Sequence, residues 1–301
     1  MNLLLNIFTK IKLNSYSGFK SKSVVPPKSF QMPSSLGVTI QKRSSQLIVS
    51  LTSYPERIKY IHYTISTLLT QTIKPDRLIL WLSTNEFPKK EKELPFSLKR
   101  LCKYGLEINW TDENIRSYTK LIPSLLSFPN EIIVTADDDI FYSEYWLESL
   151  YHSYLVEPRY IHCHRAHRIK LDFSGKIMPY ANWDLGYSIK SQSFLNFLTG
   201  VGGVLYPPNS LYKDVLKKEL FLKLCSTGDD IWFWAMAVIN DTKIMIIKDC
   251  IVHLRELEGV ELRRLYKENI FNGINDIGLQ NITNEYPIII SKIKKDLIEN
   301  E

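Results

Sequence analysis

The stretch TADDDI, residues 135 to 140, contains three consecutive carboxylates, Asp137, Asp138 and Asp139, directly after the apolar run EIIV. Like charges repel one another, and removing them from water costs free energy unless something positive lies between them. A divalent cation meets this need, because Mg²⁺ and Mn²⁺ bind through one or two carboxylates together with substrate phosphates. An acidic helix start would explain one aspartate but not three. The sequence therefore predicts a site for Mn²⁺ or Mg²⁺.

A second acidic pair lies in GDDIWFWAMA, where Asp229 and Asp230 begin a very apolar segment. The N-terminal end of a helix favours negative charge, and at least one of the two aspartates is expected to act as the N-cap. The other interpretation is a general base, a carboxylate that takes the proton from an attacking hydroxyl group. We predict Asp230 for that role, with Asp229 as the alternative.

Alternating strands and helices are expected around both acidic stretches. Apolar residues at helical spacing predict helices between successive β-branched runs, and the runs predict strands over 46–54, 76–83, 106–110 and 131–136. This alternation is typical of a parallel sheet covered by helices on both faces. In such sheets ligands bind beyond the carboxyl ends of the strands. The loops TSYPER, residues 52 to 57, and DDDI, residues 137 to 140, are therefore expected to meet.

The remaining segments complete an α/β organisation. A helix is expected over 143–156 with Ser143 as its N-cap, a strand over 159–169, a helix over 209–225 and a short strand over 243–247. Composition divides the chain into a Ser-, Lys- and Pro-rich lead-in that is partly disordered, a single catalytic domain and a basic amphipathic C-terminal helix. The expected boundaries are 1–45, 46–280 and 281–301.

Composition excludes several classes of protein. The chain has 301 residues, 45% of them hydrophobic and 23% charged, which is ordinary for a globular protein. A net charge of +6 suits phosphate-bearing ligands but is too small to predict nucleic-acid binding. Four widely spaced cysteines argue against disulfides and structural zinc, and so favour a reducing cytoplasm. No apolar stretch is long enough to span a bilayer.

Six motifs in this order resemble nucleotide-sugar-dependent glycosyltransferases of the GT-A fold, especially bacterial enzymes that build surface polysaccharides such as lipopolysaccharide. The resemblance covers roughly residues 46–280, and its motifs are IVSLTSYPERI, YTKLIPSL, IIVTADDDIFY, GVGGVLYPP, GDDIWFWAMA and NGIND. It implies a Rossmann-like, mostly parallel sheet flanked by helices. It also implies a nucleotide-sugar donor, by default a UDP-sugar, a glycan or lipid-linked acceptor, and inversion at the anomeric carbon.

The resemblance assigns roles to the acidic residues. In that family an Asp-x-Asp motif binds the divalent metal and the sugar nucleotide. Asp137 would then contact the ribose or the metal, Asp139 would be the direct metal ligand, and Asp138 would lie near the donor sugar or ribose. His253, which follows a predicted strand, would complete the metal's coordination. The acidic pair of GDD would supply the base.

The resemblance also implies donor-binding residues. Thr52, Tyr54 and Arg57 would hold the base and ribose, and Arg57 can fork onto a phosphate or a carboxylate. Lys120, at the start of a predicted helix, would contact the diphosphate. For each of these residues an ordinary loop or a solvated side chain is the alternative.

Glycines and aromatic residues form a last group of candidates. Gly202 and Gly203, next to Gly200, would let the backbone approach the donor sugar. Trp183 is the candidate for stacking on an acceptor sugar, whereas Trp232 and Trp234 are expected in the core of a helix. HCHRAH, residues 162 to 167, is expected to be a strand with polar edge residues, because no second cluster with zinc spacing follows.

Other functions fit less well. A nucleotidyltransferase, the main alternative, should carry a glycine-rich basic loop after its first strand, and SLTSYPER has no glycine. A phosphatase would carry its acidic motif on the first strand, and a sugar-binding module would not need both acidic clusters. The apolar and lysine-containing segments MNLLLNIFTKIK and YPIIISKIKKDL suggest weak attachment to the inner face of the cytoplasmic membrane; packing of the C-terminal helix on the domain is the equal alternative.

Overall fold

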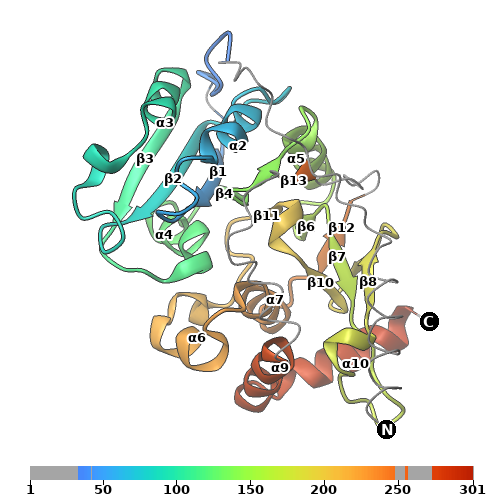
Figure 1. The fold of residues 1–301 in the computed structure, drawn as a ribbon. Helices are drawn as coiled ribbons and strands as arrows, with labels where there is room; N and C mark the ends of the chain where they lie inside the picture. Colours follow the sequence, from blue (N-terminus) through green and yellow to red (C-terminus); the bar gives the residue numbers. More distant parts are fainter. Residues whose placement is uncertain (1–32, 42, 248–254, 257–272, 301) are drawn as a thin grey trace, which may run out of the picture.

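The chain folds around an eight-stranded sheet with strand order β3-β2-β1-β4-β11-β6-β12-β9 (Figure 1). The computed structural model describes residues 33–41, 43–247, 255–256 and 273–300. The strands of the sheet are β1 (Leu47–Thr52), β2 (Arg77–Ser83), β3 (Leu106–Thr111), β4 (Ile132–Thr135), β6 (Ile161–Cys163), β9 (Gln192–Ser193), β11 (Val204–Tyr206) and β12 (Ile244–Ile246). Two smaller sheets contain β10 (Asn196–Leu198) with β7 (Ala166–Arg168) and β8 (Asp184–Tyr187), and β13 (Arg255–Glu256) with β5 (Ile140–Phe141).

The sheet is mostly parallel, as predicted. β3, β2, β1 and β4 are parallel neighbours, and β12 is parallel to β6. β11 runs antiparallel to both β4 and β6, and β9 runs antiparallel to β12. The predicted α/β class is therefore confirmed. The strand expected over 159–169 is wrong in one respect, since β6 and β7 separate at His164 and Arg165 and join different sheets.

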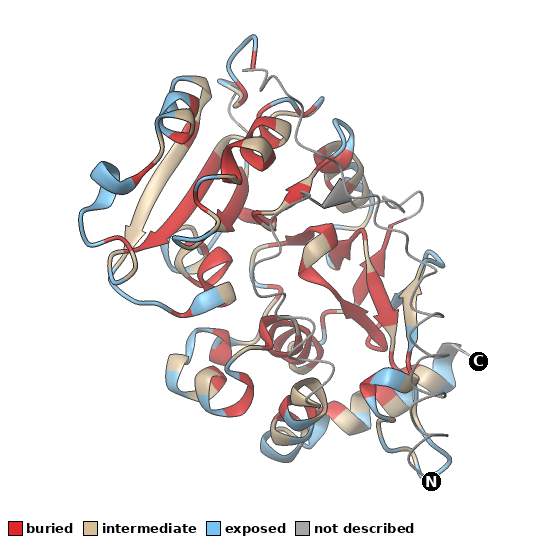
Figure 2. Ribbon diagram, in the orientation of Figure 1, coloured by how far each residue is buried: buried red, intermediate tan, exposed pale blue. Residues whose placement is uncertain are grey.

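Helices cover both faces of the sheet because its central strands are apolar on both sides. In β1, Leu47 and Val49 pack on one face with α2, α3 and α5, whereas Ile48 packs on the other with α4, α6, α7, α9 and α10 (Figure 2). The helices are α2 (Ile61–Leu68), α3 (Phe96–Leu101), α4 (Ile122–Ser127), α5 (Trp146–Val156), α6 (Lys218–Cys225), α7 (Asp229–Ile239), α9 (Ile274–Glu285) and α10 (Ile288–Asn300).

Short 3-10 helices connect these elements, and one of them ends at a candidate site residue. They are η2 (Lys90–Glu93), η3 (Cys102–Tyr104), η4 (Arg116–Lys120), η5 (Tyr180–Asn182), η6 (Gly200–Gly202) and η7 (Lys213–Leu216). η4 packs beneath β1 and β2, next to α4. η6 lies immediately before β11, so that both η4 and η6 approach the end of β4.

Two predicted helix caps differ from the structure. α5 begins at Trp146 with Tyr145 as its N-cap, and the Ser143 hydroxyl instead accepts the Tyr145 N–H at 3.4 Å. α7 has Gly228 as its N-cap without a side-chain hydrogen bond. Asp229 and Asp230 therefore occupy the first helical turn. The helix dipole stabilises their negative charge there, but neither side chain caps the helix.

The C-terminal helix α10 turns its apolar side toward the domain. Ile289 and Ile293 are fully buried. The Lys292 ammonium donates to the carbonyl oxygens of Val238 and Ile239, which end α7, at 3.1 and 2.8 Å. These contacts leave Ile288 and Ile298 as its exposed apolar residues among those described. The lipid contact expected for this helix stays a prediction, and it would have to use that outer side.

The described helices include none with the length and apolar character to cross a bilayer. Cys102 is exposed, Cys163 and Cys225 are buried, and Cys250 lies outside the described residues. Most of the predicted lead-in, residues 1–45, also lies outside them.

Candidate active site

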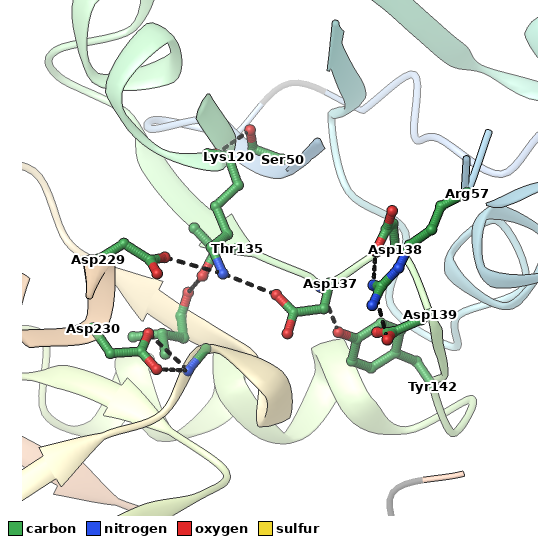
Figure 3. Close-up of polar contacts among 12 residues, drawn as sticks. Ser50, Arg57, Lys120, Thr135, Asp137, Asp138, Asp139, Tyr142, Asp229 and Asp230 are labelled. Atoms are coloured by element: carbon green, nitrogen blue, oxygen red, sulfur yellow. Dashed lines mark hydrogen bonds and ion pairs between the residues drawn. The ribbon is translucent and has the colours of Figure 1, made fainter. Parts of the chain in front are cut away.

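The end of β4 is the point at which five separate segments meet. Ser50 of β1 is paired with Thr135 of β4, and Val204 of β11 is paired with the same residue from the other side. The loop after β1 and the η6 turn before β11 therefore flank the aspartates that follow β4. Lys120 from η4 and the start of α7 complete the group (Figure 3). The packing of these segments thus brings the two acidic stretches to one place.

Arg57 neutralises two of the three consecutive aspartates. Its Nη1 lies 2.7 Å from Asp138 Oδ1 and 2.8 Å from Asp139 Oδ2. The other oxygen of Asp138 accepts a hydrogen bond from the Ser53 hydroxyl at 2.6 Å. The predicted meeting of the loops after β1 and β4 is therefore confirmed, and one guanidinium nitrogen of Arg57 bridges the two carboxylates.

The middle aspartate is a structural residue. Asp138 is 7% exposed, and both of its carboxylate oxygens have protein partners. Its carbonyl oxygen also accepts the Thr64 hydroxyl at 3.0 Å. The side chain of Asp138 turns inward to hold the loop after β1, and its predicted contact with the donor sugar or ribose stays a prediction.

Lys120 neutralises the first aspartate and links it to the second acidic pair. Its Nζ lies 2.9 Å from Asp137 Oδ1 and 3.2 Å from Asp229 Oδ2 (Figure 3). Burial lowers the pKa of Lys120, but the charges of Asp137, Asp229 and Asp230 outweigh burial and hold that pKa well above its ordinary value. Lys120 therefore stays charged while only 7% exposed.

Asp230 faces the η6 turn, and its ionisation is perturbed. Its two carboxylate oxygens accept the backbone N–H of Gly200 at 3.0 and 3.1 Å. Burial and the neighbouring charge of Asp229 raise the pKa of Asp230 to about 7, against the opposing effects of Lys120 and the Gly200 N–H. A carboxyl group with a pKa close to neutrality can accept a proton from a substrate and release it again. The structure thus gives Asp230 a property that a general base needs.

Asp229 has a different environment from its neighbour. It is 8% exposed, and its Oδ2 forms no hydrogen bond in the described part of the chain, although it lies within ion-pair distance of Lys120. Asp229 is therefore held by charge alone, whereas Asp230 is oriented by a backbone donor.

The glycines of GVGG are required by close packing. A Cβ atom added to Gly200 would lie 2.8 Å from Lys120 Nζ and 3.0 Å from Asp230 Oδ1. Gly203 has a φ of +90°, and a Cβ there would lie 2.4 Å from the Trp146 ring. The indole N–H of Trp146 donates to the Gly202 carbonyl at 2.8 Å. The turn therefore presents bare backbone to the acidic group, and its predicted contact with a donor sugar stays a prediction.

Two residues of the loop after β1 have structural partners. The Thr52 hydroxyl donates to the Trp81 carbonyl at 2.9 Å. The guanidinium of Arg57 lies 5.4 Å from the centroid of the Tyr54 ring. Both Thr52 and Tyr54 are half-buried beside the acidic group, and their predicted contacts with a nucleotide stay predictions. The position of His253 lies outside the described residues.

Trp183 is not placed to stack on an acceptor sugar. It is 4% exposed and packs among the rings of Tyr180 and Phe197. Its indole N–H donates to the Met178 carbonyl at 2.8 Å. The prediction is wrong because the segment after β7 folds back over the aromatic core. Trp232 and Trp234 are fully buried, as predicted.

The histidines of HCHRAH are buried instead of lying at a polar edge. His162, His164 and His167 are 0%, 2% and 4% exposed. Burial lowers the pKa of His162 and of His164 to about 4 and the pKa of His167 well below its ordinary value. All three are therefore neutral at pH 7 and belong to the structural core.

The structure also identifies contributors that the sequence did not suggest. The Tyr142 hydroxyl accepts the backbone N–H of Asp137 at 2.8 Å, and Ser53 fixes Asp138. Gly200 supplies the donor to Asp230. Local periodicity carries no signal for these partners, because each contact depends on how distant segments pack.

Two aspartates of the acidic group, Asp137 and Asp139, are the residues that could hold a divalent cation. Among the described residues no three His, Cys, Asp or Glu side chains converge on one point, but Mg²⁺ and Mn²⁺ do not require such a cage. The side chains of Asp137 and Asp139 are each 26% exposed. Within the described part of the chain, the group contains five aspartates, and the cations paired with them are Arg57 and Lys120. Its excess negative charge and oxygen ligands suit a hard divalent cation.

Comparisons with known proteins do not assign the chain to a family. No family model and no curated protein matches it. TarS 1-349 of S. aureus is similar in structure, with a TM-score of 0.47 and 13% identity over 78% of this chain and 72% of that chain. Its complex with UDP-GlcNAc gives 0.48 and 14% over 77% and 65%. The inositol-1-phosphate CTP transferase of T. maritima gives 0.43 and 10% over 78% and 98%. At these TM-scores the site has to be interpreted from its own geometry.

Proposed function

We propose that this protein is an inverting glycosyltransferase, which transfers a sugar from a nucleoside-diphosphate sugar, by default a UDP-sugar, to a glycan or lipid-linked acceptor in surface-polysaccharide synthesis. The observation that carries the proposal is the placing of Asp230 beside the end of β4. A carboxyl group with a pKa of about 7 lies across Lys120 and Gly200 from the part-exposed Asp137. The motif resemblance to GT-A enzymes supports the same reaction.

Asp230 would act on the acceptor. Its carboxylate takes the proton of the acceptor hydroxyl as that oxygen forms a bond to the anomeric carbon. The bond from the anomeric carbon to the diphosphate oxygen breaks at the same time, and the diphosphate leaves with the electron pair. Attack from the face opposite the leaving group inverts the anomeric configuration. The Gly200 N–H fixes the base at 3.0 Å, so the carboxylate is oriented before substrate arrives.

Asp137 and Asp139 would hold Mn²⁺ or Mg²⁺ next to the donor diphosphate. The cation would neutralise charge on the leaving diphosphate as a Lewis acid. Arg57 keeps Asp139 in place through its ion pair, and Tyr142 holds the backbone of Asp137. These contacts would orient both aspartates toward the cation.

The direct test is the release of nucleoside diphosphate from a panel of nucleotide sugars, with the acceptor fraction supplied as bacterial glycolipid. We expect release with Mn²⁺ or Mg²⁺ and none after EDTA treatment, with a product of inverted anomeric configuration by proton NMR. Release of pyrophosphate from nucleoside triphosphates would instead identify a nucleotidyltransferase. A product of retained configuration would refute the inverting mechanism.

A further inference from the structure

Lys120 has an environment that does not fit its predicted role as a diphosphate ligand. Lysine is almost never buried unless it is paired, and the side chain of Lys120 is only 9% exposed. Its ammonium group donates a hydrogen bond to Asp137 and forms an ion pair with Asp229. The η6 turn also lies against the ammonium group, since a Cβ on Gly200 would be 2.8 Å from Nζ, so a diphosphate oxygen has little room to reach it. The position favours an internal partner over a substrate.

Hydrogen bonds from β1, β2 and α4 fix the backbone of Lys120. The Ser50 hydroxyl in β1 donates to the Lys120 carbonyl at 2.6 Å (Figure 3). The hydroxyls of Ser50 and Ser124 lie 2.8 Å apart, and the Trp81 indole N–H donates to Ser124 at 2.8 Å. These buried contacts join η4 to β1, β2 and α4. Only the side chain of Lys120 therefore extends into the acidic group.

The space around the ammonium group is closed on the remaining side by η6. A Cβ on Gly200 would lie 2.8 Å from Lys120 Nζ, 3.0 Å from Asp230 Oδ1 and 3.8 Å from Asp137 Oδ1. The two acidic stretches and the turn thus share one small volume with Lys120 at its centre. Without that cation three carboxylates would repel one another across the volume.

We propose that Lys120 is a positioning residue, whose ammonium group ties the start of α7 to the aspartate that ends β4 and so fixes the orientation of Asp230. This inference rests on the proposed function for the meaning of that orientation. The contacts of Lys120 with Asp137 and Asp229, called the clamp from here on, do not depend on the reaction. It joins Asp229, the neighbour of the base, to Asp137, which faces the donor.

The clamp has a consequence for the ionisation of Asp230. The groups that act on Asp230 are Asp229, Asp137, Lys120 and the Gly200 N–H, and the buried phenols of Tyr118 and Tyr206 also lie near it. Among the charged side chains in this set, Lys120 alone favours the ionised form. Its removal should therefore raise the pH at which Asp230 releases its proton.

The test compares Lys120→Met with Lys243→Met. Methionine keeps the length of the side chain without the charge. Lys243 is a matched control, because it pairs with the buried Asp296 at 2.7 Å far from the acidic group. Carboxyl ¹³C NMR of aspartate-labelled protein, with the Asp230 signal assigned from Asp230→Asn, gives the titration midpoint without any substrate. We expect a rise of about one pH unit or more in Lys120→Met and no change in Lys243→Met.

Calorimetry with UDP and Mn²⁺ separates the two roles of Lys120. As a positioning residue, Lys120→Met should change the affinity for UDP by less than about threefold while kcat falls roughly 100-fold. A loss of UDP affinity of tenfold or more with an unmoved Asp230 midpoint would show that Lys120 is a diphosphate ligand and overturn the proposal. A Lys120→Met variant that loses stability alone, which is the result expected for Lys243→Met, would also overturn the proposal.

A second variant covers failure of Lys120→Met to fold. Gly200→Ala leaves the charge in place but puts a methyl group 2.8 Å from Lys120 Nζ and 3.0 Å from Asp230 Oδ1. We expect the two groups to separate and the midpoint to rise again; an unchanged midpoint would overturn the proposal. If the wild-type protein binds no UDP and releases none from any donor, the proposed function fails. The titration midpoints of Asp230 would still show whether Lys120 positions that residue.

Discussion

Asp230→Asn should separate the chemistry of this site from its stability. The substitution keeps the size of the side chain and one acceptor for the Gly200 N–H, but it removes the group that takes the proton. We expect kcat to fall by about 10²–10⁴-fold, the usual worth of a positioned base. KM should change little, because the interaction develops in the transition state. The donor should still bind, since Asp137 and Asp139 are unchanged.

The same substitution should make the protein more stable at alkaline pH. The pKa of Asp230 in the folded chain is about 7 against an ordinary 3.8, so the folded state binds the proton more tightly than the unfolded state. The stability contributed by this group is therefore present at low pH and is lost as pH rises from about 4 to 7. The shift corresponds to about 4 kcal/mol. Because the side chain is half-buried and keeps contact with water, we expect about 2 kcal/mol.

Urea unfolding of both proteins at pH 4.5 and pH 8 measures this difference. On going from pH 4.5 to pH 8, the free energy of unfolding of Asp230→Asn should rise by about 2 kcal/mol relative to that of the wild type. Asp184→Asn is the control, since Asp184 is half-exposed in a surface pair with Lys170, and it should show no such gain. A stability difference that does not depend on pH would refute the raised pKa. Near-wild-type turnover in Asp230→Asn, with loss of turnover in Asp229→Asn, would move the base to Asp229.

Three further predictions concern other parts of the molecule. Asp139→Ala should abolish Mn²⁺-dependent binding of UDP in calorimetry while leaving the circular dichroism spectrum unchanged; binding at wild-type affinity would exclude Asp139 as a metal ligand. Asp296→Ala should lower the free energy of unfolding by about 2–4 kcal/mol in urea, because it leaves Lys243 and the buried Phe194 N–H without their partner; a loss below about 1 kcal/mol would show that these polar contacts contribute little to holding α10. The pKa values of about 4 for His162 and His164 lie below their ordinary 6.5, so each should lower the free energy of unfolding by about 2 kcal/mol as the pH falls from 7 to 5. If the double variant His162→Gln/His164→Gln loses less stability over this range than the wild type, these histidines cause the loss; an equal loss in both proteins would contradict the prediction.

Local pattern was sufficient for the architecture. The β-branched runs that became β1, β2, β3 and β4 are readable because a strand buried on both faces must be apolar along its whole length. The order of strands and helices then places loops at one edge of the sheet. From these two rules the sequence alone located the acidic stretch after β4 and its meeting with the loop after β1.

Side-chain pairing was decided by the tertiary structure. The sequence predicts a cation among the aspartates, but it does not show that Arg57, 81 residues away from Asp138, supplies one. Trp183 reads as an exposed aromatic residue in a polar loop, and burial in the aromatic core reverses that interpretation. Both outcomes depend on which distant segments pack together, and neither periodicity nor turn chemistry carries that information.

The two acidic stretches show which properties follow from sequence and which require the tertiary structure. Their residue types and their places, after a strand and at the start of a helix, were fixed by sequence. The perturbed ionisation of Asp230 was not, because a pKa depends on burial and on charges within a few ångströms. Asp229, Lys120 and the Gly200 N–H reach Asp230 only after η4, η6 and α7 have packed against β4. A sequence can thus identify the candidate catalytic groups, whereas the fold sets the distances that determine their proton affinity.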